Sequence, residues 1–169
     1  MDLIAQYHAA ITAMLQKILD TQKEAIRTAA RRCADAIAED RYLYVIGTGG
    51  HSYIASEEMF WRAGGLVPIY PILDPGLSLS QGAWRSNLIE RTPGYVIPIL
   101  KYHGIGNGDV LIVCNAYGLN AATIDAADRV ERAYWQVVVP GSEIVVSRDP
   151  RMTPESRWQW EGFGWRRRA

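Results

Sequence analysis

Two short apolar runs, each followed by a loop and then by a helical pattern, constrain this fold more than any other feature. The first run covers residues 42–46 and leads into GTGGHS, and the second covers 110–114 and leads into NAYGLN. Continuous apolar runs are typical of strands buried on both faces of a parallel sheet. Ligands of such sheets bind at the carboxyl ends of the strands. The sequence therefore predicts an α/β sheet with two loops that can form one binding site.

The pattern around these runs predicts alternating helices and strands. Residues 1–39 carry apolar side chains three and four positions apart, without Gly or Pro, which indicates a long amphipathic helix. A break near 19–21 is the alternative. Further elements are expected in this order: a helix over 52–63, an edge strand or irregular strand over 66–72, a short helix over 95–101, a helix over 121–133 capped by Asn120, and a strand over 136–139.

The end of the chain follows no clear period. We expect one domain over residues 1–140 and a divergent tail over 141–169, which is rich in Pro, Gly, Arg and Trp. One hypothesis is a truncated chain with a shifted reading frame near 132–140. The alternative is a natural tail that packs on a partner through its tryptophans.

Composition excludes several classes of function. Lys plus Arg and Asp plus Glu both total 18, so a general nucleic-acid binder is not expected. No segment approaches the roughly 18 apolar residues of a membrane span. Cys33 and Cys114 are expected to be buried, reduced thiols of a cytoplasmic protein. Scattered histidines form no metal cluster, so neither a metal nor a cofactor is expected. We expect Trp61 and Trp84 in the core and His103 on the surface.

The first loop has the chemistry of an anion site. A helix N-terminus presents unpaired N–H groups and a partial positive charge, and glycines let a ligand approach the backbone. The alternative is that these glycines only form a tight turn. A dinucleotide fingerprint is not expected, because Ser52 takes the third glycine position and Asp74 lies beyond the required spacing of about 20 residues. A phosphate-binding loop of the Gly-Lys-Ser/Thr type is also absent.

These residues resemble SIS domains, the sugar-isomerase fold. The resemblance rests on GTGGHS at 47–52, the following Glu57-Glu58 pair and the RAGGL stretch at 62–66, and it continues through 71–95 and 108–127. The resemblance covers about residues 1–133. Within the family, the chain is most similar to a bacterial group described as phosphosugar isomerases or SIS-domain proteins. The resemblance implies a flavodoxin-like, three-layer parallel sheet, a phosphosugar ligand, and a homodimer or higher homo-oligomer with sites near the interface.

The resemblance also suggests a set of ligand-binding residues. Thr48, His51 and Ser52 of the first loop match the family well. The second loop departs, because many SIS domains have a Ser-x-Ser-Gly phosphate cradle where this chain has Asn-Ala-Tyr-Gly at 115–118. Asn and Tyr suit neutral hydroxyls as well as phosphate oxygens. The candidate ligand-binding residues are Gly47, Thr48, Gly49, Gly50, Ser52, Arg85, Ser86, Asn115, Tyr117, Gly118 and Asn120. Arg85 is a candidate because a guanidinium binds phosphate or carboxylate through paired contacts, and the alternative for it, slightly preferred, is a surface or interface salt bridge.

Isomerisation of a sugar needs a base that moves a proton between adjacent carbons. The candidates are Glu57 or Glu58 as the general base, with His51 as partner. On a helix that starts near His51, Glu58 lies on the same face about two turns on, and Arg62 would keep it ionised. The alternative is a pair of surface charges, one of them paired with Arg62. The sequence thus predicts a phosphosugar isomerase, or alternatively a non-catalytic, regulatory sugar-phosphate-binding module.

Overall fold

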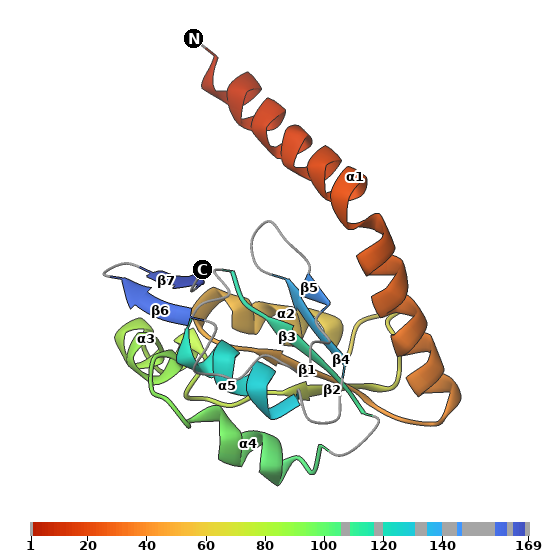
Figure 1. The fold of residues 1–169 in the computed structure, drawn as a ribbon, viewed down its shortest axis with the longest axis vertical. Coiled ribbons are helices and arrows are strands. Elements are labelled where there is room, and N and C mark those ends of the chain that lie inside the picture. The colour runs from red at the N-terminus through yellow and green to blue at the C-terminus, as the bar shows by residue number, and fades with distance from the viewer. Residues whose placement is uncertain are drawn as a thin grey trace.

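The computed structural model describes residues 2–105, 109–116 and 120–130, and the backbone of four later strands (Figure 1). Its main sheet has the strand order β2-β1-β3-β4-β5. The strands are β1 (Leu43–Gly47), β2 (Ile69–Ile72), β3 (Val110–Cys114), β4 (Trp135–Val139) and β5 (Val145–Val146). A separate antiparallel pair consists of β6 (Trp158–Glu161) and β7 (Gly164–Arg167).

Helices connect these strands. They are α1 (Leu3–Ala38), α2 (Tyr53–Met59), α3 (Ala83–Glu90), α4 (Val96–Tyr102) and α5 (Ala121–Val130), with short 3₁₀ turns η1 (Gly50–Ser52) and η2 (Leu79–Gln81). The long helix expected over residues 1–39 is confirmed, since α1 runs without interruption and without the alternative break near 19–21. Asp2 caps α1, and its carboxylate accepts from the N–H groups of Ile4 and Ala5.

The sheet is parallel from β2 to β4, and only β5 runs antiparallel to its neighbour. β1 and β3 lie side by side, and the last residue of β1, Gly47, is in register with the last residue of β3, Cys114. Both loops highlighted by the sequence therefore start from the same edge of the sheet. This register, rather than the composition of either loop alone, creates the site.

Helices cover both faces of the sheet, which confirms the expected three layers (Figure 1). On one face, Leu43, Val45 and Ile69 pack against the end of α1 and Met59 of α2. The second core cluster joins Ile46 and Leu111 to side chains of α4 and α5. Because successive side chains of a strand point to opposite faces, a continuous apolar run fills both clusters.

Several predicted elements have different bounds in the structure. The helix expected over 52–63 ends at Met59, and the strand expected over 66–72 begins only at Ile69. The edge position expected for this strand is confirmed. Pro98 is accommodated in α4 because it lies in the first turn, where backbone N–H groups have no intrahelical partner. Apart from its three short strands, the tail predicted over 141–169 lies outside the described residues.

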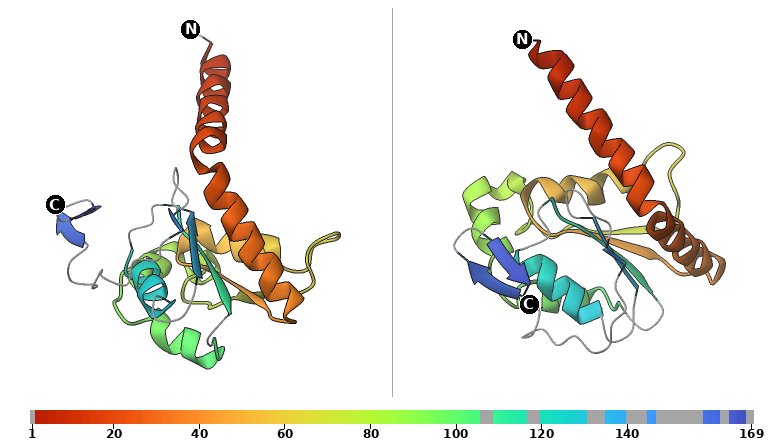
Figure 2. Two further views of the ribbon diagram at one scale, coloured as in Figure 1. Left: turned by 45° about the vertical axis from the view of Figure 1, so that its right-hand side comes forward. Right: turned by 45° about the horizontal axis from the view of Figure 1, so that its top comes forward.

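The long helix α1 extends well beyond the sheet (Figure 2). Only Ala36, near its end, is fully buried. Its N-terminal half presents large apolar side chains to solvent, with Leu3, Ile4, Tyr7, Met14 and Leu15 each more than half exposed. The structure shows no helix in its described residues that is long and apolar enough to cross a membrane. An exposed apolar stripe on a helix of this kind is typical of a surface that another protein covers.

Candidate functional site

The two loops after β1 and β3 are joined directly by hydrogen bonds. The N–H of Thr48 donates to the carbonyl of Cys114 at 3.0 Å, which extends the parallel ladder by one residue. Beyond it, the N–H of Ala116 donates to the hydroxyl of Ser52 at 2.9 Å. The structure therefore brings the two loops of the sequence prediction together at one edge of the sheet.

Thr48 lies at the centre of this junction and is fully buried. The amide of Asn115 donates to the carbonyl and the hydroxyl of Thr48 at 3.0 and 3.2 Å. The Asn120 amide donates to the same carbonyl at 2.5 Å, and the hydroxyls of Thr48 and Thr123 bond to each other. These polar groups are satisfied inside the protein, so Thr48 and Asn115 act as the frame of the loops.

Asn120 also begins helix α5, as the sequence predicts. Its side-chain oxygen accepts from the N–H of Thr123 at 2.8 Å and from the Thr123 hydroxyl at 2.6 Å. This is the N-cap arrangement, in which a side chain satisfies an unpaired helix donor. One residue thus holds the start of α5 and the carbonyl of the first loop. The predicted ligand residues Tyr117 and Gly118 lie outside the described residues.

A third segment reaches the first loop from η2 and α3. Ser86 is buried, its hydroxyl donates to the carbonyl of Leu77 at 3.0 Å, and it accepts from the N–H of Gly50 at 3.2 Å. Arg85, its exposed neighbour, donates to the carbonyl of Pro75 at 3.3 Å. Ser86 is therefore part of the loop's support, while Arg85 lies at the surface of the same segment.

Two glycines are required by close approach rather than by the turn alone. A Cβ on Gly47 would overlap the Ser52 carbonyl oxygen and lie 2.5 Å from its carbonyl carbon, because the start of α2 passes directly over β1. Gly49 has φ of 132°, a conformation that other residues rarely adopt. A Cβ there would overlap the carboxylate of Glu90 and lie 3.1 Å from the amide nitrogen of Asn120.

Glu90 is a site residue that sequence reasoning missed. It is the last residue of α3, its side chain is only 17% exposed, and one carboxylate oxygen lies 3.2 Å from the guanidinium of Arg91. Burial raises the pKa of the Glu90 carboxyl, although Arg91 and a hydrogen bond with Asn120 oppose that shift. The sequence around Glu90 has no clear amphipathic period, so only the fold reveals that it faces the first loop.

The predicted catalysts lie at the surface of the same region. Glu57, Glu58 and His51 are all exposed. Arg62 lies 3.2 Å from the carboxylate of Glu58, as expected, and both side chains are more than half exposed. This geometry matches the alternative reading of a surface ion pair. The phenol of Tyr53 is buried beside Glu57, and its burial raises the pKa to about 12, so it stays protonated at neutral pH.

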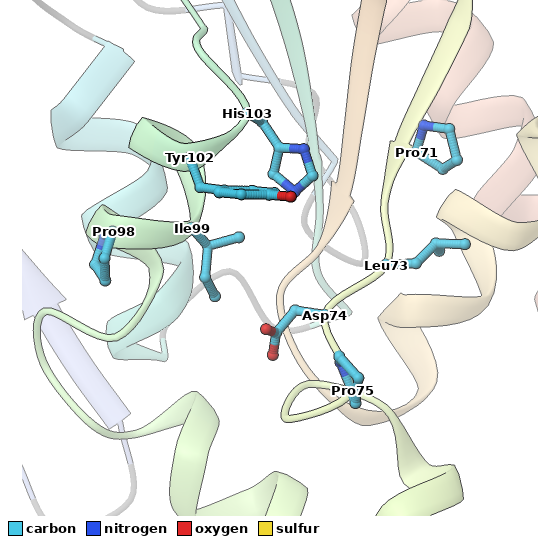
Figure 3. A pocket seen from close by; sticks show the side chains of 8 residues that line it. All are labelled: Pro71, Leu73, Asp74, Pro75, Pro98, Ile99, Tyr102 and His103. Carbon is cyan, nitrogen blue, oxygen red and sulfur yellow. The ribbon is translucent and has the colours of Figure 1, made fainter.

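A separate cleft of about 550 Å³ opens beyond the end of β2 (Figure 3). Figure 3 shows the carboxylate of Asp74 pointing into it, opposite Ile99, with Tyr102 and His103 above. The lining is mostly apolar: Pro71, Leu73, Asp74, Pro75, Pro98, Ile99, Tyr102 and His103. None of the sequence-predicted site residues lines this cleft, so it is distinct from the two-loop site.

Asp74 is the acidic group of this cleft and is held firmly. Its carboxylate accepts from the hydroxyl of Tyr95 and from the N–H of Gly76, both at 2.8 Å. Burial and the bond to Asp74 raise the pKa of Tyr95. Burial lowers the pKa of His103, although Asp74 acts in the opposite direction. His103 thus lines a cleft and is half-buried, which differs from the surface position expected.

Other expectations can be compared with the described part of the chain. Trp61 and Trp84 are 89% and 75% exposed, so their predicted place in the core is wrong. Cys33 and Cys114 are free, and burial raises the pKa of both thiols. The described ranges contain no group of His, Cys, Asp and Glu side chains that could hold a metal ion.

Comparison with known proteins agrees with this architecture. The SIS domain family matches residues 6–140, which is most of the chain. The chain belongs to the SIS domain family. A SIS domain implies, in general terms, the binding of phosphosugars or an isomerase-type role. The long N-terminal helix and the parallel sheet described above are consistent with this fold.

This SIS domain also has relatives in bacteria. A UPF0309 protein of Listeria innocua is 34% identical over 145 residues, covering 85% of this chain and 58% of the relative. A UPF0309 protein of Listeria monocytogenes is 33% identical over 156 residues, covering 92% and 63%. One of Brucella ovis is 43% identical over 122 residues, covering 72% and 50%. The chain thus spans about half to three fifths of these relatives' length.

Proposed function

We propose that this SIS domain binds a sugar derivative, with a phosphosugar as the preferred class, at the two loops after β1 and β3. The observation that carries the proposal is their direct connection, in which Ser52 accepts from the N–H of Ala116 and Asn120 holds the carbonyl of Thr48. Such a connection fixes two strand-end loops as one unit at the edge where parallel sheets bind ligands. The exposed His51 lies beside this unit and can contact a ligand.

Within the proposal, the loops have different tasks. Thr48, Asn115 and Ser86 have their side chains in internal hydrogen bonds, so they hold the loops in place. His51 is exposed and available to a ligand, and the half-buried Ser52 can donate its hydroxyl proton to a ligand while it accepts from the N–H of Ala116. Asn120 belongs to this frame as well, and the glycines of the first loop leave room for a phosphate beside the backbone.

Two roles follow from such a site. In the first, the protein is a phosphosugar isomerase, and a carboxylate moves a proton between adjacent carbons of the ligand. In the second, it is a regulatory module that binds the sugar phosphate without changing it. The exposure of Glu57 and Glu58, and the pairing of Glu58 with Arg62, favour the second role if these two glutamates are the only candidate bases.

We also propose that two copies of the chain associate through α1. The N-terminal half of this helix presents Ile4, Tyr7, Ile11 and Met14 at spacings of three and four, all of them exposed. Such a stripe pairs well with an identical helix, which would remove these side chains from water.

The free thiols of Cys33 and Cys114 fit the reducing cytoplasm in which we place the protein.

A thermal-shift screen tests the binding proposal. Sugar phosphates, the same sugars without phosphate, and inorganic phosphate are compared. A ligand at about 100 times its Kd stabilises the folded state by about 2.7 kcal/mol, which raises the Tm of a chain this size by roughly 5–10 °C. His51→Ala should reduce the shift, whereas the matched change His8→Ala, on the exposed part of α1, should not.

Each outcome of this screen has a defined meaning. A shift with sugar phosphates that exceeds the shift with inorganic phosphate supports a phosphosugar site. Equal shifts with phosphorylated and unphosphorylated sugars would restrict the proposal to neutral sugars. If no sugar derivative raises the Tm, the proposed function is wrong.

A further inference from the structure

The side chain of Glu90 lies where three segments of the site meet. Its carboxylate is against the α-carbon of Gly49, so closely that a Cβ at Gly49 would occupy the place of one of its oxygens. It is also hydrogen-bonded to Asn120, which holds the second loop and the carbonyl of Thr48. A ligand seated between the two loops would therefore lie beside this carboxylate.

The surroundings of Glu90 differ from those of the surface glutamates. Its side chain is 17% exposed, whereas that of Glu58 is 58% exposed. Arg91 is the charged group that faces it, and that side chain is itself mostly exposed. A carboxylate that is partly removed from water is a stronger base than one at the surface, and such groups cluster at functional sites.

The fold also fixes Glu90 in place. It is the final residue of α3, a helix whose Ser86 bonds to the N–H of Gly50 and to the carbonyl of Leu77. The next segment turns sharply, and the N–H of Gly94 donates to the carboxylate of Asp125 in α5 at 2.6 Å. The segment around Glu90 is thus tied to the first loop on one side and to helix α5 on the other, and a positioned carboxylate needs such support.

We propose that Glu90 is the proton-transfer group of the two-loop site and acts on a sugar derivative bound there. This inference rests on the proposed function, and it assigns the chemistry to a residue other than Glu57 and Glu58. The carboxylate of Glu90 removes the proton from C2 of an aldose, and the C–H electron pair forms the C1=C2 double bond of an enediol while the carbonyl electron pair moves to O1, which takes a proton from water. Glu90 then returns its proton to C1, where the C1=C2 electron pair binds it, and O2 gives its proton to water as it becomes the ketose carbonyl.

The overall reaction conserves atoms and electrons, so it needs no oxidant, reductant or cofactor. Gly49 has a specific part in it, because only a residue without a Cβ leaves room for the carboxylate at that point. Asn120 holds the carboxylate from the other side and is a positioning residue. General base catalysis of this kind typically contributes about 10²–10⁴ to a rate.

Hydrogen exchange in heavy water tests the assignment even when the product of the reaction has not been identified. Aldose and ketose forms of hexose 6-phosphates and pentose 5-phosphates are incubated with the protein in D₂O. Proton NMR follows the loss of hydrogen at C2 of the aldose and C1 of the ketose, and calorimetry measures binding of the same compounds. The variants are Glu90→Gln, Glu90→Asp, the double variant Glu57→Gln with Glu58→Gln, and the control Glu24→Gln on the exposed part of α1.

The expected result separates binding from proton transfer. Glu90→Gln should bind the active sugar phosphate with a similar Kd and exchange it at least about 100-fold more slowly. The double variant and the control should exchange at the wild-type rate. As the pH is lowered, the exchange rate of the wild type should fall with a midpoint above 4.5, the ordinary pKa of a glutamate. This acid-side fall should be absent in Glu90→Gln.

Several results would overturn the assignment. Undiminished exchange by Glu90→Gln would exclude Glu90, and loss of exchange in the double variant alone would return the role to Glu57 and Glu58. Binding without exchange by the wild type would leave a binding module and no proton-transfer group. If the wild type binds none of these compounds, the proposed function fails and this inference with it. If Glu90→Gln does not fold, Glu90→Asp takes its place, because the shorter side chain draws the carboxylate back from Gly49. A hydrogen-exchange rate of Glu90→Asp equal to that of the wild type would then exclude the assignment.

Discussion

Gly47→Ala should destabilise the fold because a helix passes directly over the last residue of β1. The new Cβ would overlap the carbonyl oxygen of Ser52 and lie 2.5 Å from its carbonyl carbon, whereas Cβ contacts under 3.0 Å are essentially never found, so the helix start must retreat by more than about 0.5 Å. The obstructing atoms are backbone, so no side chain can rotate away. Overpacking costs about 1–3 kcal/mol, and we expect about 3 kcal/mol here. Urea denaturation followed by far-UV circular dichroism measures it.

The matched control separates a steric clash from a strained backbone. Gly64 has φ of 76°, and a Cβ there would meet no atom within 4 Å. Gly64→Ala should therefore lower the free energy of unfolding only by the strain of an alanine in the left-handed backbone conformation, which is about 1–2 kcal/mol. Gly47→Ala should also weaken the bond between Ser52 and Ala116 and reduce ligand binding, whereas Gly64→Ala should not. A Gly47→Ala protein as stable as the wild type would refute the close packing of α2 on β1.

Three further predictions concern other parts of the molecule. Ser86→Ala should lower the free energy of unfolding by about 2 kcal/mol in urea, because the N–H of Gly50 and a backbone carbonyl lose their partner; a cost under about 0.5 kcal/mol would refute this support. Burial raises the pKa of Glu90, so its contribution to stability is present below about pH 4.5 and is lost as the pH rises through that raised value. In Glu90→Gln, the urea midpoint should therefore change less with pH across this range than it does in the wild type. The same pH dependence of the midpoint in both proteins would contradict the burial of Glu90. Ile11→Lys with Leu15→Lys should convert a dimer to a monomer in light scattering with little change in Tm, and a monomeric wild type at tens of micromolar would disprove the α1 interface.

The sheet was predictable because its central strands are buried on both faces. The residues of β1 and β3 are almost all apolar, and no other structure accommodates such short continuous runs as well. Once both runs are strands of a parallel sheet, their following loops must leave from the same edge. The cap at Asn120 was predictable for a local reason, since one side chain and the helix behind it determine the hydrogen bond.

The role of the α3 segment was not predictable from local patterns. Its residues alternate without a clear apolar face, and helix α3 is held instead by single contacts such as the bonds of Ser86. Glu90 reaches Gly49 across 41 positions of the chain, and only the tertiary fold determines that distance.

The exposure of Trp61 and Trp84 was not predictable from the sequence for a different reason. Large apolar residues are often buried, but the rule does not run in reverse, because much of a protein's surface is apolar. Trp61 has a positive φ of 54° and lies in the connection after α2, where the chain has already left the sheet. Trp84 is the second residue of α3, a helix that packs through the buried Ser86. Burial at these positions depended on the path of the chain rather than on side-chain type.

Amide NMR of glycine tests whether a sugar derivative binds between the two loops. The chain has 15 glycines, so selective ¹⁵N-glycine labelling gives a simple spectrum. On titration with the sugar phosphate that gives the largest thermal shift, the amide signals of Gly49 and Gly50 should move with one common Kd. Movement of the Gly76 and Gly104 signals instead, beside the cleft of Asp74 and His103, with Gly49 and Gly50 unchanged, would show that the ligand does not bind between the two loops.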